Sequence, residues 1–540
     1  MRRREFLQAA AITSAGVTCG THAARAGSSA AGEAGFDDDS PVVEATISQL
    51  LAGLQAGRWS ATELVHWYLQ RIEAIDRNGP KLNAVLEINP EAVDIAQRLD
   101  AERKRGRLRG ALHGIPILIK DNIDTADKMT TTAGSLALEG WHPPNDSGVA
   151  ARLRQAGAVI LGKTNLSEWA NFRSNHSSSG WSGRGGQTRN PYVTNRNPCG
   201  SSSGSGVAAA ASLCAAAIGT ETNGSIVCPS SINGVVGIKP TVGQVSRAGI
   251  IPISHTQDTA GPMARTVADA ALLLAAISGA DPRDAATQHD HPFFSTRDIR
   301  LDADGLRGKR IGVARDYFGF DDRVDELAES AIKLLADRGA TLIDPVKLRV
   351  RGAGQAAFDL LLYEFKADLD AYLKNVVPEL PVHSLQELIE FNRKHADREM
   401  PFFGQELFEL AQAKGTLEDD AYRQALATVR KAYREDGIDK LMEEHRLDAI
   451  VAPTTGPSWV TDLVYGDRGS GGSSSPAARA GYPNVTVPMG YIAGLPVGLS
   501  FIGSAFSEPK LVTIAYAFEQ AAAARKRPRF AEEVTSPTAP

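Results

Sequence analysis

Short runs of apolar and β-branched residues recur along the chain, and segments with helical periodicity separate them. The runs are AVLEI (84–88), IPILI (115–119), AVILG (158–162), IGVAR (311–315) and AIVAP (449–453). Strands that alternate with helices form a sheet whose faces the helices cover, so this pattern predicts an α/β fold. Capping boxes at Thr46 with Gln49 and at Ser60 with Glu63 predict two helix starts.

Three segments depart from this alternation. From about 355 to 445 the periodicity is almost entirely helical, which predicts a helical insertion. Between 174 and 206 the chain is rich in Gly, Ser and Asn, and it runs into VAAAASLCAAAIGTETNGS, which we expect to be helical. The tract GSGGSSSPAARAG at 469–481 is predicted to be a mobile loop.

Composition and charge exclude several classes of protein. The 540 residues are 43% hydrophobic and 22% charged, which is typical of a globular chain with a large core. The net charge is −5 and the basic residues are scattered, so we expect no nucleic-acid partner. After the N-terminal segment no apolar run reaches the roughly 18 residues needed to span a membrane. The histidines and cysteines lack ligand spacing, so we expect no metal and no other cofactor; the oligomeric state is not indicated.

The N-terminal segment has the features of an export signal. MRRREFLQAAAITSAGV begins with arginines, continues into an apolar stretch and precedes a small-residue cleavage pattern at Ala24–Ala26. Arg3 and Arg4 match the twin-arginine pattern. We therefore expect a signal peptide at 1–26, a flexible spacer at 27–42 and a periplasmic or secreted mature protein. The alternative is a frayed basic terminus.

The cysteines give little guidance. Cys19 would leave with the signal peptide, and Cys199, Cys214 and Cys228 remain as an odd number. One pair could form in an oxidising compartment. Buried free thiols are the more common state for cysteines beside alanine-rich runs, and the sequence leaves the redox state of these three residues open.

Gly200–Gly204 satisfies the G-x-S-x-G pattern of a nucleophile elbow, with Ser202 at its centre. An elbow needs a strand directly before the serine, whereas NPYVTNRNPC is typical of a loop. His255 and His445 are the remaining candidates for a partner base. The loop before the serine therefore disfavours a nucleophile elbow in which Ser202 attacks with help from a histidine.

A second serine, Ser225, lies in GTETNGSIVCPSS, between Gly224 and a turn at Cys228–Pro229. A serine hydroxyl becomes a good nucleophile only when a base removes its proton. Lys120 ends the apolar run PILIK, where burial can leave a lysine as the neutral amine. Taken alone, Lys120 is more simply a strand-end cation that reaches solvent.

Six sequence motifs together favour a catalytic role for Lys120 over this simpler interpretation. They are GALHGIPILIKDNID, GKTNLSEWANFRS, NPCGSSSGSGVAAAASL, GTETNGSIVCPSSINGVVGIKPT, DTAGPMARTVADAA and AGYPNVTVPMGYIAGLPVGLSFIG. In this order they resemble the amidase signature family over roughly residues 43 to 525, most closely its bacterial peptide amidases. The resemblance implies one large α/β domain at 43–530, in which helices cover both faces of a central mixed sheet.

The resemblance also implies roles for individual residues. Lys120 would be the base, Ser201 the serine with a cis peptide bond, and Ser225 the nucleophile. Backbone N–H groups of the loop would stabilise the oxyanion, and Ser202 would form a hydrogen bond within the triad. The loop residues are Thr222, Asn223, Gly224 and Ser225.

Two positions depart from the family pattern. Asn223 stands where glycine is usual, and asparagine tolerates a positive φ. Val227 stands where arginine is common, so a cation near the site is lost. This puts in doubt any preference for acidic substrates and any structural ion pair at this position.

The expected function is that of an exported serine amidase that hydrolyses primary amides, in particular the C-terminal amide of peptides. The alternatives are an amidase of other small aliphatic or aryl amides, a glutaminase subunit of the tRNA-dependent amidotransferase, and a non-catalytic periplasmic binding protein. We expect pocket-lining residues within 355–445 and 460–467. Trp459, Tyr465 and Phe402 are candidates for the pocket lining or for the core, and the core is the favoured alternative.

Overall fold

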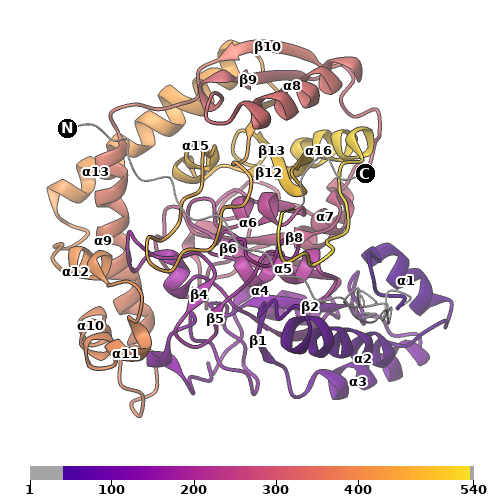
Figure 1. Ribbon diagram of the computed structural model, residues 1–540, viewed down its shortest axis with the longest axis vertical. Coiled ribbons are helices and arrows are strands. Elements are labelled where there is room, and N and C mark those ends of the chain that lie inside the picture. Colours follow the sequence, from indigo (N-terminus) through magenta and orange to yellow (C-terminus); the bar gives the residue numbers. More distant parts are fainter. Residues whose placement is uncertain (1–39, 535–540) are drawn as a thin grey trace, which may run out of the picture. The chain divides into compact units, whose positions relative to one another are not determined.

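The predicted strand runs lie in one large sheet in the computed structural model of the protein, which describes residues 40–534 (Figure 1). The expected signal peptide and the spacer up to residue 39 lie outside the described residues. All five runs are strands: β1 (Val85–Ile88), β2 (Pro116–Lys120), β3 (Val159–Thr164), β9 (Arg310–Ala314) and β11 (Ala449–Pro453). The prediction from β-branched runs is confirmed.

The sheet has eleven strands in the order β1-β3-β2-β6-β8-β7-β12-β13-β11-β9-β10. Its remaining strands are β6 (Ala216–Glu221), β7 (Val236–Lys239), β8 (Thr259–Ala264), β10 (Thr341–Val346), β12 (Asn484–Ile492) and β13 (Leu495–Ile502). Strands β3, β2 and β6 run parallel, as do β11, β9 and β10, and the other neighbours are antiparallel. The sheet is therefore mixed, as expected. A separate hairpin pairs β4 (Trp181–Ser182) with β5 (Gly186–Gln187).

Helices pack on both faces of this sheet (Figure 1). They are α1 (Ile47–Gln55), α2 (Ala61–Arg71), α3 (Ala92–Lys104), α4 (Gly148–Gln155), α5 (Ser203–Ala210), α6 (Val227–Ile232), α7 (Val267–Ile277), α8 (Asp322–Asp337), α15 (Ser474–Ala480) and α16 (Glu508–Ala522). Both predicted capping boxes are present, at the starts of α1 and α2. Val42, which we placed in the spacer, is fully buried in the core.

The segment from 355 to 445 is almost entirely helical, as its periodicity predicted. It contains α9 (Gly354–Leu373), α10 (Leu385–Lys394), α11 (Ala396–Glu399), α12 (Glu406–Gln412), α13 (Asp420–Arg430) and α14 (Lys440–Glu444). Apolar side chains of α9, α10 and α12 form one cluster with Trp141, Trp169 and Ile253. The insertion is thus packed onto loops at the carboxyl ends of the central strands. Within residues 40–534 no helix is long and apolar enough to cross a membrane.

Two segments fold differently from our expectation. The alanine-rich run after Gly206 is not one helix, because α5 ends at Ala210 and the strand β6 begins at Ala216. Every residue of β6 is buried in the middle of the sheet, so tertiary packing overrides the helix propensity of alanine. The 469–481 tract is not simply a loop, since it contains α15, which ends at Ala480 and is capped by Gly481 with a φ of 72°.

The structure also answers the open question of the cysteines. Cys199 and Cys228 form a disulfide with their Cα atoms 6.1 Å apart, and Cys214 is a buried free thiol. The two partners are 29 residues apart in sequence, but the turn from α5 through β6 to α6 brings them together. The disulfide therefore joins the segment before Ser201 to the helix after Ser225.

Candidate active site

Lys120 is fully buried at the end of β2, between β3 and β6. Its Nζ lies 2.8 Å from the Oγ of Ser201 and 2.9 Å from the Oγ1 of Thr220 on β6. A strand-end cation that reaches solvent is therefore the wrong interpretation of this residue. The geometry instead places the amine beside a serine hydroxyl.

Burial lowers the pKa of Lys120 to about 7, and the nearby charges of Asp258 and Glu221 oppose only part of this shift. A lysine with such a pKa is neutral in a large fraction of molecules near pH 7. The neutral amine has a lone pair that can accept a proton. Lys120 can therefore serve as a base.

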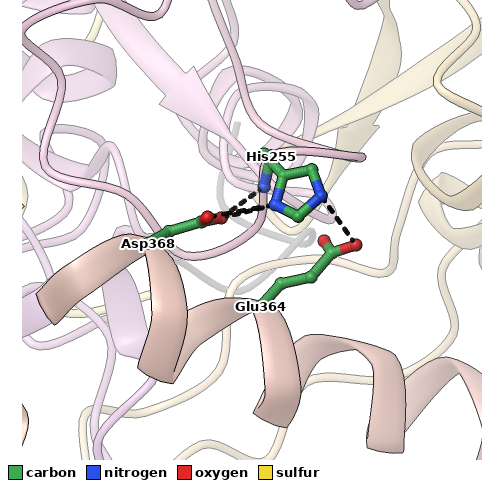
Figure 2. A group of neighbouring side chains, drawn as sticks. All are labelled: His255, Glu364 and Asp368. Atoms are coloured by element: carbon green, nitrogen blue, oxygen red, sulfur yellow. Dashed lines mark hydrogen bonds and ion pairs between the residues drawn. The ribbon is translucent and has the colours of Figure 1, made fainter. Parts of the chain in front are cut away.

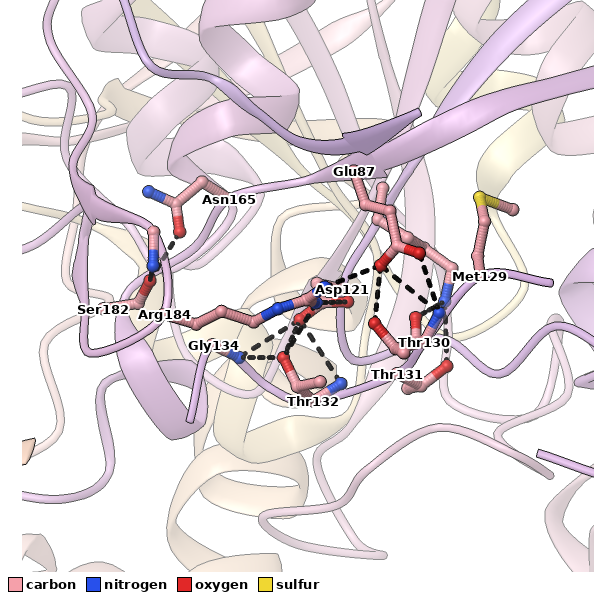
Figure 3. Close-up of polar contacts among 12 residues, drawn as sticks. Glu87, Asp121, Met129, Thr130, Thr131, Thr132, Gly134, Asn165, Ser182 and Arg184 are labelled. Atoms are coloured by element: carbon pink, nitrogen blue, oxygen red, sulfur yellow. Dashed lines mark hydrogen bonds and ion pairs between the residues drawn. The ribbon is translucent and has the colours of Figure 1, made fainter. Parts of the chain in front are cut away.

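The chain directly after Lys120 is fastened by the polar network of Figure 3. The carboxylate of Asp121 accepts hydrogen bonds from the hydroxyl of Thr132 and, at 3.2 Å, from the N–H of Gly134. Arg184 lies 3.7 Å from Asp121 and 2.8 Å from Glu87. These contacts fix the end of β2 and hence the position of Lys120.

Ser201 is fully buried, and the peptide bond between Gly200 and Ser201 is cis, as the family resemblance implied. The carbonyl oxygen of Ser201 accepts a hydrogen bond from the N–H of Ser167 at 3.0 Å. Its hydroxyl faces Lys120. The structure thus brings together the first two residues of the expected relay.

Ser225 lies between β6 and α6 and is 8% exposed. Its carbonyl oxygen accepts a hydrogen bond from the N–H of Ser202 at 3.1 Å, so the two serine loops are in direct contact. Within residues 40–534 the Oγ of Ser225 makes no hydrogen bond. The Lys120–Ser201 contact is therefore formed in this structure, whereas the hydroxyl-to-hydroxyl contact between Ser201 and Ser225 is not.

Ser202 contacts the triad through its backbone, because its N–H donates to the carbonyl of Ser225, whereas its side chain lies against β6. Its Oγ donates to the carbonyl of Thr220 at 2.9 Å and accepts from the N–H of Thr220 at 3.1 Å, because it faces the β6 backbone. It therefore ties the Ser201 loop to the strand that precedes Ser225. The same two bonds make Ser202 unsuitable as an elbow nucleophile, and His255 pairs with Asp368 instead.

The carboxylate of Glu221 holds the Ser225 loop. It accepts hydrogen bonds from the N–H groups of Gly224 at 2.8 Å, Ile226 at 2.8 Å and Val227 at 3.0 Å. The N–H of Gly224, which we expected in the oxyanion hole, is thus engaged elsewhere. Three backbone donors satisfy this buried carboxylate without the cation that Val227 replaces.

The remaining candidates for the oxyanion hole are the N–H groups of Thr222, Asn223 and Ser225, which make no hydrogen bond within residues 40–534. The positive φ of the loop, 86°, falls at Gly224 and not at Asn223. The side chain of Asn223 instead accepts from Ser474 at 2.8 Å and donates to Ser475 at 3.2 Å. The start of α15 thereby holds the Ser225 loop from another side.

A cavity of about 490 Å³ adjoins the site. Asn122, Thr220 and Thr222 line the end next to Lys120, and α9 contributes Asp368 and Tyr372. The insertion therefore lines the cavity as expected, whereas no residue of 460–467 does so. Our expectation of core positions was wrong for Phe402 and Tyr465, which lie on surface loops and are 45% and 65% exposed, and Trp459 is only half-buried.

The cavity rim carries one cluster, within residues 40–534, with the residue types of a metal site: His255, Glu364 and Asp368 (Figure 2). The Nδ1 of His255 lies 2.9 Å from Asp368, and its Nε2 lies 3.4 Å from Glu364. Each ring nitrogen therefore faces a different carboxylate. Although burial lowers the pKa of His255, the hydrogen bond that its ring donates to Asp368 and the charges of both carboxylates raise the pKa above its ordinary value. This arrangement is typical of a protonated histidine that links its loop to α9.

Sequence reasoning missed three residues of the site: Asn122, Thr220 and Glu221. Each lies within four residues of Lys120 or the Ser225 loop, but polar residues next to a motif carry no spacing signal of their own. Their contacts become evident only when β2 and β6 lie side by side.

Comparisons with known proteins agree with this geometry. The family model for amidases matches residues 63–512. The structure of the peptide amidase from Stenotrophomonas maltophilia is 53% identical, with a TM-score of 0.85, and the match covers 91% of this chain and 99% of that chain. A probable amidase of Arabidopsis thaliana is 45% identical and is covered to 92%, with 91% of this chain matched.

One component of the glutamyl-tRNA(Gln) amidotransferase from Caldanaerobacter subterraneus is 34% identical over 88% of this chain and 96% of that protein. The match to the family model spans most of the chain, and these relatives share nearly its full length. The chain therefore belongs to the amidase signature family and is a hydrolase that acts on amide carbon–nitrogen bonds.

Proposed function

We propose that the protein is an exported serine amidase that hydrolyses the C-terminal amide of peptides to the free acid and ammonia. The observation that carries the proposal is the 2.8 Å contact between Lys120 and Ser201 in a buried site, next to the loop that presents Ser225. Ser225 is the one of the three that is partly exposed, as an attacking nucleophile must be.

The reaction begins when the Oγ of Ser225 turns toward Ser201. Neutral Lys120 takes the proton of Ser201, Ser201 takes the proton of Ser225, and the Ser225 oxygen bonds to the amide carbonyl carbon. Free N–H groups of the loop stabilise the oxyanion. The carbon–nitrogen bond then breaks, the nitrogen leaves as ammonia with a proton returned through the relay, and water cleaves the acyl-Ser225 ester in the same manner.

Two observations favour a peptide amide over other substrates. The chain is 53% identical to a peptide amidase and 34% identical to the amidotransferase component. A cavity of about 490 Å³ on the Thr222 side of the Ser225 loop has room for a peptide acyl group. Selection against internal peptide bonds would rest on exclusion of any residue beyond the leaving nitrogen.

Two observations support export. The segment with Arg3 and Arg4 has a twin-arginine pattern. The disulfide between Cys199 and Cys228 is a feature of proteins in oxidising compartments and is rare in the cytosol. Both argue against a protein that works on aminoacyl-tRNA.

The substrate proposal is tested with a blocked dipeptide amide and the same sequence extended by one residue. We expect conversion of the amide to its acid with release of ammonia, and no cleavage of the extended peptide, both followed by mass spectrometry. Cleavage of the internal bond at a comparable rate, or activity confined to short aliphatic or aryl amides, would contradict the peptide assignment.

A further inference from the structure

Asn122 occupies a fixed position between the catalytic lysine and the cavity. It follows Lys120 by two residues, lines the cavity and is 2% exposed. Its backbone carbonyl accepts the N–H of Ile251 at 2.9 Å, and its side-chain Nδ2 donates to the Oγ1 of Thr220 at 3.0 Å. Thr220 in turn contacts Lys120. Both the main chain of Asn122 and the NH₂ group of its side-chain amide are thus held in place.

The other end of this side chain has no partner. Among the described residues, the Oδ1 of Asn122 makes no hydrogen bond, although it is buried. A buried carbonyl oxygen without a donor costs free energy that the enzyme would recover when a ligand supplies the donor. Because Nδ2 is held by Thr220, the side chain cannot turn to satisfy Oδ1 without losing that bond.

The substrate class supplies such a donor next to the scissile carbonyl. A peptide amide carries N–H groups on both sides of that carbon: the leaving carboxamide and the Nα–H of the terminal residue. We propose that the Oδ1 of Asn122 accepts one of these N–H groups and is a determinant of specificity for peptide amides, an inference that rests on the proposed reaction at Ser225. Substrates without that donor would leave the oxygen unpaired and would react more slowly.

Asn392 provides a matched control. It is buried on α10, its Nδ2 donates to Gln405 at 3.0 Å, and its Oδ1 also lacks a partner among the described residues. It does not line the cavity next to Lys120. Asn392→Leu therefore makes the same chemical change as Asn122→Leu, away from the substrate.

The experiment compares three substrates: N-acetyl-phenylalaninamide, its Nα-methyl derivative and the methyl ester of N-acetyl-phenylalanine. We expect that Asn122→Leu lowers kcat/KM for the first substrate by about tenfold, and lowers it much less for the one analogue that lacks the bonded N–H. If Asn122→Leu removes the difference in kcat/KM between the amide and its Nα-methyl derivative, the Nα–H is the group that bonds to Asn122. If it removes the difference between the amide and the ester, the carboxamide N–H is that group. Asn392→Leu should leave all the ratios at the wild-type values.

Asn122→Asp keeps an acceptor oxygen, so its ratio of kcat/KM between N-acetyl-phenylalaninamide and the analogue without the bonded N–H should equal the wild-type ratio. If Asn122→Leu does not fold, the test compares Asn122→Asp with Asn122→Ala instead. Unchanged ratios in both arms for the variants that lack the acceptor would overturn the inference. If wild-type enzyme hydrolysed benzamide but none of the three substrates, the proposed function would be wrong. Benzamide and methyl benzoate would then replace the peptide amide and its ester in the test of the carboxamide N–H.

Discussion

The Nζ of Lys120 lies 2.8 Å from the Oγ of Ser201, and both side chains are fully buried. A charged lysine in such a place would need a carboxylate in contact, and its hydrogen-bond partners are two hydroxyls and, at 3.4 Å, a carbonyl oxygen. The pair is therefore better suited to proton transfer than to an ion pair. The predictions below follow from this contact and from the groups that hold it.

Removal of either end of the relay should abolish turnover without unfolding the protein. We expect Lys120→Met and Ser225→Ala each to lower kcat by at least about 10³-fold, and the double variant to lose little more, because the residues act as one unit. Ammonia release and circular dichroism measure the two properties.

Lys163 is the matched control for Lys120. It is also a fully buried lysine, near the end of the neighbouring strand β3, but it donates to the carbonyls of Ile123 and Thr130 at 2.8 and 2.9 Å. Lys163→Met should lower the free energy of unfolding by about 1–3 kcal/mol and keep most of kcat. A Lys120→Met enzyme with most of its activity would show that the lysine is not the base.

The pH dependence follows from the lowered pKa of Lys120. The active form is the neutral amine, so kcat/KM should be constant above about pH 7 and fall about tenfold per unit below it, as the amine gains a proton. Initial rates from pH 4 to 9 measure this limb. A rate that stays flat down to pH 4 would refute a lysine base.

Glu221 should matter for turnover more than for substrate binding. Its carboxylate accepts hydrogen bonds from the N–H groups of Gly224, Ile226 and Val227. A glutamine in its place has only one acceptor oxygen, and its NH₂ group would face N–H groups to which it cannot bond. We expect Glu221→Gln to lower kcat by about 10–100-fold with little change in KM, because the Ser225 loop loses its shape.

Glu508→Gln is the control for Glu221→Gln. Glu508 is a buried carboxylate that accepts the N–H of Thr241 at 2.6 Å, outside the site. This variant should change stability and leave kcat intact. Equal kcat losses in the two variants would show that general destabilisation explains both.

The disulfide should support both stability and the alignment of the serine loops. Cys199 lies two residues before Ser201, and Cys228 lies three residues after Ser225. For this separation of 29 residues, the double variant Cys199→Ser with Cys228→Ser should lose about 3.6 kcal/mol in the free energy of unfolding. Its kcat should also fall, whereas Cys214→Ser should keep kcat.

Peptide mapping without reductant shows directly whether the bridge forms. Mature protein recovered from the periplasm or medium should carry Cys199 linked to Cys228. Free thiols at both positions in exported protein, or export of a variant with Arg3 and Arg4 replaced by lysine, would contradict the proposed route.

Sequence patterns were sufficient for five strands of the sheet and for the helical segment, because apolar periodicity is a local property. Lys120, Ser201 and Ser225 were selected by the family resemblance and not by periodicity. Sequence patterns failed at β6, where alanine and glycine favour other structures and only burial between β2 and β8 makes a strand. They also failed for the disulfide, which depends on the path of the chain between Cys199 and Cys228.

The detailed contacts of the site likewise depend on tertiary structure and not on local sequence. Lys120 could be recognised from its position at the end of an apolar run, but its contact with Thr220 depends on the pairing of β2 with β6. The anchoring of Asn223 by Ser474 joins residues 251 apart in sequence. Such long-range polar contacts leave no periodic trace in a single sequence.

The central claim is that Ser225 forms the acyl intermediate with help from Lys120 and Ser201. Labelling with a fluorophosphonate, followed by peptide mass spectrometry, tests it most directly. We predict a single adduct on the peptide that contains Ser225, formed in parallel with loss of activity, and strongly slowed in Lys120→Met. An adduct on Ser201 or Ser202 instead, or full activity with no adduct at Ser225, would contradict the account.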